Sequence, residues 1–385
     1  MKKYSNKIKV AIIEPVGGHG GMNYYDFCLA EGLVAAGAEV TVYTCDKTNI
    51  PKGLPFGVKL SFLKIWGHNP KILRAFRFFI CLLKTMFDVR EKKIELIHYH
   101  FFHYTKMEIL CVLMARIFAL KIVITAHDVE SFAGKYSAQV AYRILSMANK
   151  VIAHNKVSRL ELVNKVNMPK SMIAIIPHGH YLNSIPKNPS PSIALKKLSL
   201  TSNPVLLFFG QIKEVKGLEL LLNALPPVIA TFPNLKLLIA GKVWKDDFSK
   251  YKKIINENNL QNNVDIYIRY ISDEDVATFY RAADIVILPY RRIYQSGVLL
   301  MAMSYGLPVL VSDLEGMTEI IQDNVNGFVF KTGDVKSLSM KLIDVLNDSG
   351  KLKLVASQGF KTVVKKHNWG MIGEKTIKLY REILI

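Results

Sequence analysis

The sequence is poor in cysteine and lacks any long, uncharged apolar run. Its four cysteines include no CxxC pair, which argues against a disulfide framework or a cysteine-based zinc site. We interpret Cys28, Cys45, Cys81 and Cys111 as reduced core thiols of a cytoplasmic protein. No window approaches the roughly 18 apolar residues of a membrane span, so we expect no integral membrane segment.

Acidic residues are also scarce, with 31 Asp and Glu against 51 Lys and Arg, a formal net charge of +20. The excess lies mainly in residues 1–190, which carry 26 basic and 12 acidic residues, against 25 and 19 in the remainder. A positively charged surface attracts nucleic acid, anionic lipid or a phosphorylated substrate, and the net charge alone does not distinguish among these partners. No helix-turn-helix, zinc-finger, RNP or KH signature accompanies the charge, so we do not expect nucleic acid as a partner.

Short β-branched runs alternate with helix-length segments along the whole chain, which predicts parallel sheets wound with helices. The basic N-terminus leads into an apolar run, Val10–Ile13, that is too short for a signal-peptide core and is expected to be the first strand. The strands expected in the first half are residues 9–13, 39–43, 96–99, 122–125 and 151–153. Those expected in the second half are residues 205–209, 235–240, 264–267, 285–288 and 309–311.

At 385 residues the chain exceeds what one hydrophobic core usually serves, so two α/β domains are expected. A Pro/Ser-rich stretch interrupts the pattern and is interpreted as the interdomain linker. The expected division is a first domain over residues 1–182, a linker over 183–204, a second domain over 205–366, and a C-terminal helix over 367–385.

The first expected strand runs into GGHGG at residues 17–21, followed by a helix from about Met22. Glycines let the backbone approach a ligand, and a helix N-terminus favours an anion; an ordinary tight turn is the alternative. Together with AEGLVAAGAEVTVYT at residues 30–44, this segment resembles the start of the family-4 retaining glycosyltransferases. The resemblance implies the GT-B fold, two Rossmann-like doubly wound parallel-sheet domains with a C-terminal helix crossing back. It also implies that Gly20 and Gly21 lie near the donor phosphates.

Histidines follow two expected strands in IHYHFFHY at residues 97–104 and ITAHDVESF at residues 124–132. Open α/β sheets bind ligands at such strand ends. We expect structural roles rather than a metal site for His98, His100 and His103. His127 resembles the family histidine that faces the transferred sugar and is the expected catalytic contact, with a structural histidine as the alternative.

In the second half, LLFFGQIKEVKGLELLLNAL at residues 206–225 resembles the family's donor-phosphate segment, in which two basic residues reach the diphosphate. Lys216 matches the second basic position. The first is Gln211 here, with Lys213 as the expected substitute. Two cations suit a diphosphate of about two negative charges. Solvated surface lysines are the alternative.

Residues 281–330 carry the most specific resemblance, to the donor-binding core of the same family. The turn Gln295-Ser296-Gly297 would offer backbone N–H groups and a helix N-terminus to the diphosphate, and Ser296 is also a good N-cap. Many family members carry a pair of glutamates where this chain has Ile293 and Met301, which we interpret as divergence. Glu319 and Glu315 remain as nearby candidate polar contacts, and Glu319 is included among the donor-binding residues.

Residues 69–93 form a basic amphipathic stretch that suits the surface of an anionic membrane, with a core helix as the alternative. We therefore expect a cytoplasmic protein, peripheral on the inner face of the plasma membrane. The resemblance implies transfer of a hexose, with retention, from a nucleoside-diphosphate sugar to a glycolipid or polysaccharide precursor. No metal or other cofactor is expected, because lysines and helix dipoles supply positive charge. The alternatives are a sugar-nucleotide epimerase or phosphorylase on the same fold, or a non-catalytic scaffold.

Overall fold

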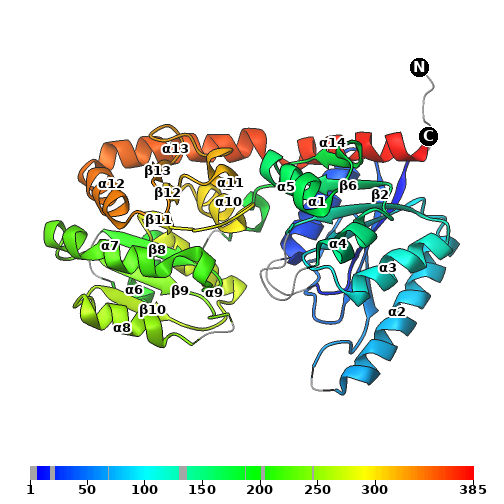
Figure 1. Cartoon of the computed structure of the whole chain (residues 1–385), viewed down its shortest axis with the longest axis horizontal. Coiled ribbons are helices and arrows are strands. Elements are labelled where there is room, and N and C mark those ends of the chain that lie inside the picture. Colours follow the sequence, from blue (N-terminus) through cyan, green and yellow to red (C-terminus); the bar gives the residue numbers. More distant parts are fainter. Residues whose placement is uncertain are drawn as a thin grey trace. The chain divides into compact units, whose positions relative to one another are not determined.

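The computed structural model describes residues 7–17, 22–67, 69–129, 137–186, 188–200, 204–244 and 247–385. The chain divides into two compact units (Figure 1). The first unit joins Met1–Gly179 to His367–Ile385, and the second is His180–Lys366. Each unit contains one parallel sheet.

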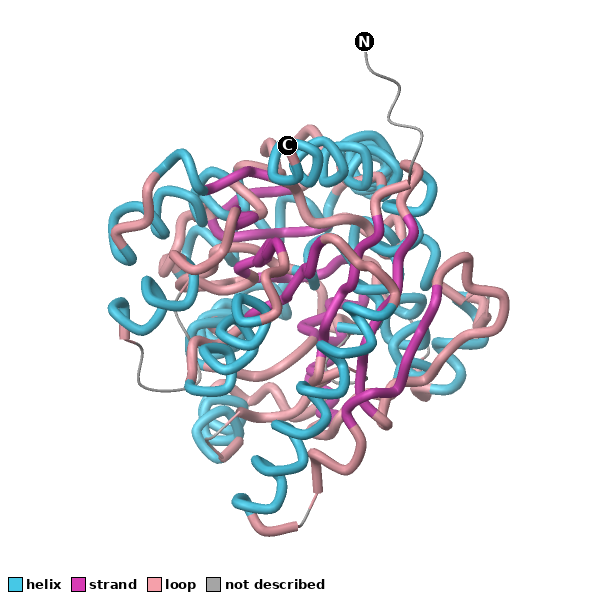
Figure 2. The backbone as a smooth tube through the Cα atoms, turned by 90° about the vertical axis from the view of Figure 1, so that its right-hand side faces the viewer, coloured by secondary structure: helices cyan, strands magenta, loops and turns pink. Residues whose placement is uncertain are grey.

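The sheet of the first unit has the strand order β3-β2-β1-β4-β5-β6-β7, and every neighbouring pair is parallel. Its strands, magenta in Figure 2, are β1 (Lys9–Glu14), β2 (Glu39–Cys45), β3 (Gly57–Phe62), β4 (Leu96–Phe101), β5 (Lys121–Ala126), β6 (Lys150–Ala153) and β7 (Ile173–Ile175). All residues of β4 are buried, as expected for a parallel strand covered on both faces.

The helices of the first unit are α1 (Met22–Ala35), α2 (Lys71–Glu91), α3 (Lys106–Ile117), α4 (Ala138–Leu145), α5 (Lys156–Val166) and α14 (Trp369–Leu384). The predicted return of the C-terminal helix is confirmed: α14 packs against α1 (Figure 1). The two backbones approach closely at a pair of glycines. A Cβ on Gly373 would lie 2.1 Å from the carbonyl oxygen of Gly32.

The sheet of the second unit has the parallel order β10-β9-β8-β11-β12-β13. Its strands are β8 (Val205–Phe209), β9 (Lys236–Ala240), β10 (Val264–Tyr267), β11 (Ile285–Leu288), β12 (Val309–Ser312) and β13 (Phe328–Phe330). Its helices are α6 (Pro191–Lys197), α7 (Leu218–Thr231), α8 (Ser249–Glu257), α9 (Asp273–Ala282), α10 (Gly297–Ser304), α11 (Glu315–Thr318), α12 (Val335–Asn347) and α13 (Ser349–Lys366). None of the helices in the described ranges is long and apolar enough to cross a membrane.

The fold class predicted from the sequence is confirmed, since both sheets are parallel and each predicted strand is present. Three short or edge strands, β3, β7 and β13, were not predicted. The stretch 183–204, predicted as a linker, belongs to the second unit. It contains α6, which packs against α9 and buries Ala194 in that unit's core.

Candidate functional site

Polar side chains of the first unit gather where its strand order reverses. β1 lies between β2 and β4, so the chain leaves β1 and β4 towards opposite sides of the sheet. Open α/β sheets bind ligands at such a switch point. Glu14 ends β1, His100 lies near the end of β4, and His127 directly follows β5; all three are buried.

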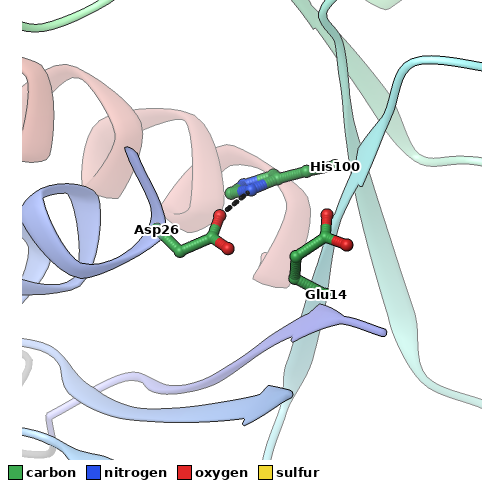
Figure 3. Close-up of side chains that lie close together, drawn as sticks. All are labelled: Glu14, Asp26 and His100. Atoms are coloured by element: carbon green, nitrogen blue, oxygen red, sulfur yellow. Dashed lines mark hydrogen bonds and ion pairs between the residues drawn. The ribbon is translucent and has the colours of Figure 1, made fainter. Parts of the chain in front are cut away.

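Glu14, His100 and Asp26 of α1 form a buried cluster (Figure 3). His100 Nδ1 lies 2.5 Å from Asp26 Oδ1, and one ligand atom from each residue lies within 4.8 Å of the others. Burial, and then the neighbouring Asp26, raise the pKa of Glu14 to about 8, while burial raises the pKa of Asp26 and lowers that of His100 to about 4. These shifts favour the uncharged forms, although two carboxyl groups and an imidazole also match the ligands of a divalent cation.

The sequence reasoning missed this cluster because Asp26 lies within a helix, where an acidic residue is normally expected to be solvated. Glu14 carried one signal, its place at the end of a strand on the expected ligand-binding edge. Its Oε1 accepts a hydrogen bond of 2.8 Å from the Val16 N–H, just before the glycine-rich segment. The predicted donor contacts Gly20 and Gly21 lie outside the described residues.

His127 is held in a chain of buried hydrogen bonds. Its Nδ1 lies 3.2 Å from Nε2 of His154, whose Nδ1 lies 3.0 Å from the carbonyl oxygen of Ile176. The ring of Phe102 stacks on His127 with centroids 4.5 Å apart and an interplanar angle of 9°. Burial lowers the pKa of His127 well below its ordinary value, so the ring is a neutral hydrogen-bonding group rather than a cation.

His98 and His103, the two remaining histidines in or after β4, lie in different surroundings. Both ring nitrogens of His98 are hydrogen-bonded, one to Thr125 and the other to the Tyr380 hydroxyl of α14. His103 is exposed on the loop after β4. Thus His98 ties the sheet to the returning helix, which is a structural role.

In the second unit, the loop after β8 brings a lysine to the start of a helix. Gly210 ends this strand region with φ of +100°, and a Cβ there would lie 3.1 Å from Lys216 Nζ and 3.4 Å from Val298 Cγ2. Val298 is the second residue of α10, so Lys216 and the first turn of α10 both lie beside Gly210. The Lys216 ammonium also lies 5.2 Å from the centre of the Tyr290 ring. The role of Gly210 in bringing these two segments together was not predicted from the sequence.

The turn before α10 has the predicted capping geometry. Ser296 Oγ accepts a hydrogen bond of 3.2 Å from the Leu299 N–H. A Cβ on Gly297 would lie 2.8 Å from the hydroxyl of Tyr181, a neighbour that was not predicted from the sequence. A side chain at Gly297 would therefore displace the Tyr181 hydroxyl from the start of α10.

The remaining predicted residues differ in exposure. The Lys213 ammonium lies 5.0 Å from the centre of the Trp244 ring. Gln295 is half-buried, whereas Glu319 is exposed at the end of α11. Ile293 and Met301 are partly buried and pack against the core of the second unit. The positions matched to the family glutamates therefore serve apolar packing in this chain.

Two known protein families match successive parts of this chain. Residues 19–183 match the family described as Glycosyltransferase Family 4, and residues 193–362 match the family described as Glycosyl transferases group 1. Anabaena HepE in complex with UDP-glucose has a TM-score of 0.77 and 18% identity, covering 97% of this chain and 100% of that chain. That likeness shows the fold.

Relatives by sequence include an uncharacterized glycosyltransferase of Methanocaldococcus jannaschii, 28% identical over 46% of this chain and 44% of that protein. O-antigen chain mannosyltransferase B of Escherichia coli is 25% identical over 67% of this chain and 70% of that protein. The chain spans about half the length of several curated relatives that it matches.

Proposed function

Because this chain belongs to the GT-B glycosyltransferases of the family-4 type, we propose that it transfers a hexose from a nucleoside-diphosphate sugar to an acceptor hydroxyl. The acceptor class we propose is a glycolipid or polysaccharide precursor, with retention of the anomeric configuration, as in the family. Two comparisons support the substrate classes: HepE binds UDP-glucose, and the E. coli relative is an O-antigen mannosyltransferase.

The observation that carries the proposal is the grouping of Lys216, Gly210 and the start of α10. A departing diphosphate needs positive charge and N–H donors, and a lysine beside a helix N-terminus supplies both. Lys213 adds a second cation in the same loop. We propose that transfer needs no metal for this reason, so that chelation with EDTA leaves activity unchanged.

A thermal-shift panel of nucleotide sugars tests the donor class, because a ligand that binds only the folded state raises the melting temperature. We expect Lys216→Ala to weaken nucleoside-diphosphate binding by about 10- to 100-fold, the loss of one charge-assisted hydrogen bond. Lys253→Ala, which removes an exposed lysine of α8, is the control and keeps wild-type affinity in calorimetry. Equal affinity in Lys216→Ala and the wild type would remove Lys216 from the donor site.

We also propose that the first unit meets an anionic bilayer through α2. Its buried face packs on the unit, while Ile72 is 85% exposed, Phe76 62% and Phe87 60%. These exposed apolar side chains follow a helical spacing beside the basic Arg77 and Lys84. Apolar side chains flanked by cations match the interfacial helices of peripheral proteins.

A non-catalytic GT-B scaffold is the second candidate, favoured by the apolar packing of Ile293 and Met301. A scaffold releases no nucleoside diphosphate when acceptor is added. An epimerase or phosphorylase on the same fold is distinguished by the same assay, since its turnover does not require the acceptor.

A further inference from the structure

The hydrogen bond between His127 and His154 has a direction that a backbone carbonyl sets. A carbonyl oxygen only accepts, so the Nδ1 of His154 that faces Ile176 O at 3.0 Å carries a proton. Burial lowers the pKa of His154 to about 4 and lowers that of His127 well below its ordinary value. Near neutral pH each ring is therefore uncharged and carries a single N–H.

The position of the His154 proton determines the tautomer of His127. With its proton on Nδ1, His154 presents a lone pair at Nε2, which accepts the hydrogen bond from Nδ1–H of His127 at 3.2 Å. Nε2 of His127 is then a lone pair. This atom is buried and has no hydrogen-bond partner within the part of the chain that the structure describes.

The hydrogen bond to His154 sets the tautomer of His127, and neighbouring aromatic rings restrict the orientation of its imidazole. Phe102 stacks on one face, and the ring of Tyr25 meets His127 with centroids 4.7 Å apart and an interplanar angle of 82°. A rotation of the imidazole would break the bond to His154 and disturb both contacts. The Nε2 lone pair is thus held in one direction before any ligand binds.

We propose that His154 is a positioning residue: with the Ile176 carbonyl it fixes His127 as the Nδ1–H tautomer, whose Nε2 accepts a hydrogen bond from a hydroxyl of the transferred sugar. This inference rests on the proposed function. It sets a substrate requirement, because a deoxy carbon cannot donate to Nε2, and a carboxylate would place its own lone pairs against that of the ring. The donor must carry a free hydroxyl at the position that meets His127.

Nitrogen NMR of histidine-labelled apo protein tests the tautomer without any substrate. In the wild type we expect the His127 signals to show a protonated Nδ1 and an unprotonated Nε2, with assignment from His127→Gln. His154→Phe keeps an aromatic ring but removes the acceptor, so the His127 proton moves towards Nε2. His154→Gln retains both a donor and an acceptor and is expected to restore the wild-type tautomer. An Nε2–H tautomer in the wild type, or no change in His154→Phe, overturns the proposal.

Kinetics then test the substrate requirement, with the nucleotide sugar identified by the thermal-shift panel and its monodeoxy analogues. One analogue should lose about tenfold or more in kcat/KM with the wild type, the effect of one lost hydrogen bond to a buried acceptor, and the penalty should shrink in His154→Phe. Equal penalties in both proteins overturn the proposal. If no nucleotide sugar binds, the proposed function has failed, while the NMR result still decides the tautomer.

Discussion

Single residues of the first unit place ionisable groups where water does not reach them. Glu14 and Asp26 are 2% and 1% exposed, and the ordinary charges of both carboxyl groups are disfavoured by burial. The Glu14 carboxyl also accepts the N–H of Val16, so its protonation state bears on the start of the glycine-rich segment. The cluster therefore links pH to stability.

Replacing Glu14 by Gln should stabilise the protein at high pH relative to low pH. The pKa of Glu14 is raised from 4.5 to about 8, so between these values the unfolded chain releases a proton that the folded chain keeps, and the free energy of unfolding falls as pH rises. The amide of the variant carries no such proton. Since one pKa unit corresponds to about 1.4 kcal/mol, the gain of Glu14→Gln over wild type should grow by a few kcal/mol from about pH 5 to about pH 9.

Urea unfolding at the two pH values measures this change. Glu382→Gln, which removes an exposed carboxyl from α14, is the control and should show no such trend. A difference between Glu14→Gln and wild type that does not depend on pH would mean that the folded protein holds Glu14 as freely ionised as the unfolded chain.

Elements were predictable where their sequences are long and apolar. The strands β1, β8 and β11 were predictable because strands covered on both faces carry continuous apolar runs. β3 was missed because it is an edge strand with mostly exposed or half-buried side chains, and β7 and β13 have only three residues each. The Pro and Ser residues around α6 predict a linker, but in the structure Ser190 caps this helix and Pro191 occupies its first turn.

The contact between α1 and α14 gives a stability prediction opposite in sign to ordinary helix propensity. Gly→Ala in a helix usually stabilises, but a Cβ on Gly373 would lie 2.1 Å from the carbonyl oxygen of Gly32. Gly373→Ala should therefore lower the free energy of unfolding by about 1–3 kcal/mol, the usual cost of overpacking. Gly350→Ala in α13, where only the Asp348 side chain is near, is the control in thermal unfolding. A Gly373→Ala variant as stable as the wild type would show that the two helices separate at little cost.

The exposed face of α2 gives a prediction about membranes. Replacing the exposed Lys71, Lys84 and Arg90 of α2 by Gln should weaken binding to phosphatidylserine-containing vesicles by about a hundredfold, since each cation near the surface contributes about 1 kcal/mol. Binding should also weaken as salt rises. A triple Gln variant at Lys361, Lys365 and Lys366 of α13 makes the same charge change and should bind like the wild type. Undiminished sedimentation of the α2 variant with vesicles would remove this helix from the interface.

At the scale of the whole molecule, the alternation of strand and helix patterns along the chain predicted two parallel-sheet units, whereas the return of the last helix was implied by the family resemblance. It could not predict which side chains meet. Lys216 and α10 come together through Gly210, across some 80 residues of sequence, and Asp26 reaches His100 from a helix in which its burial was unexpected. The family resemblance nominated Lys216 and His127 as site residues, whereas Glu14, Asp26 and His154 were identified only from the packing.

The central claim is that this molecule passes a sugar from a nucleotide to an acceptor, and acceptor-dependent release of nucleoside diphosphate tests it most directly. The purified protein is given the nucleotide sugar identified in the thermal-shift panel, labelled in the sugar, with and without a lipid-linked oligosaccharide fraction. We predict that label enters the lipid phase in step with nucleoside-diphosphate release, only when acceptor is present, and that Lys216→Ala loses most of both. Nucleotide binding without acceptor-dependent release, or release at the same rate without acceptor, would contradict the account.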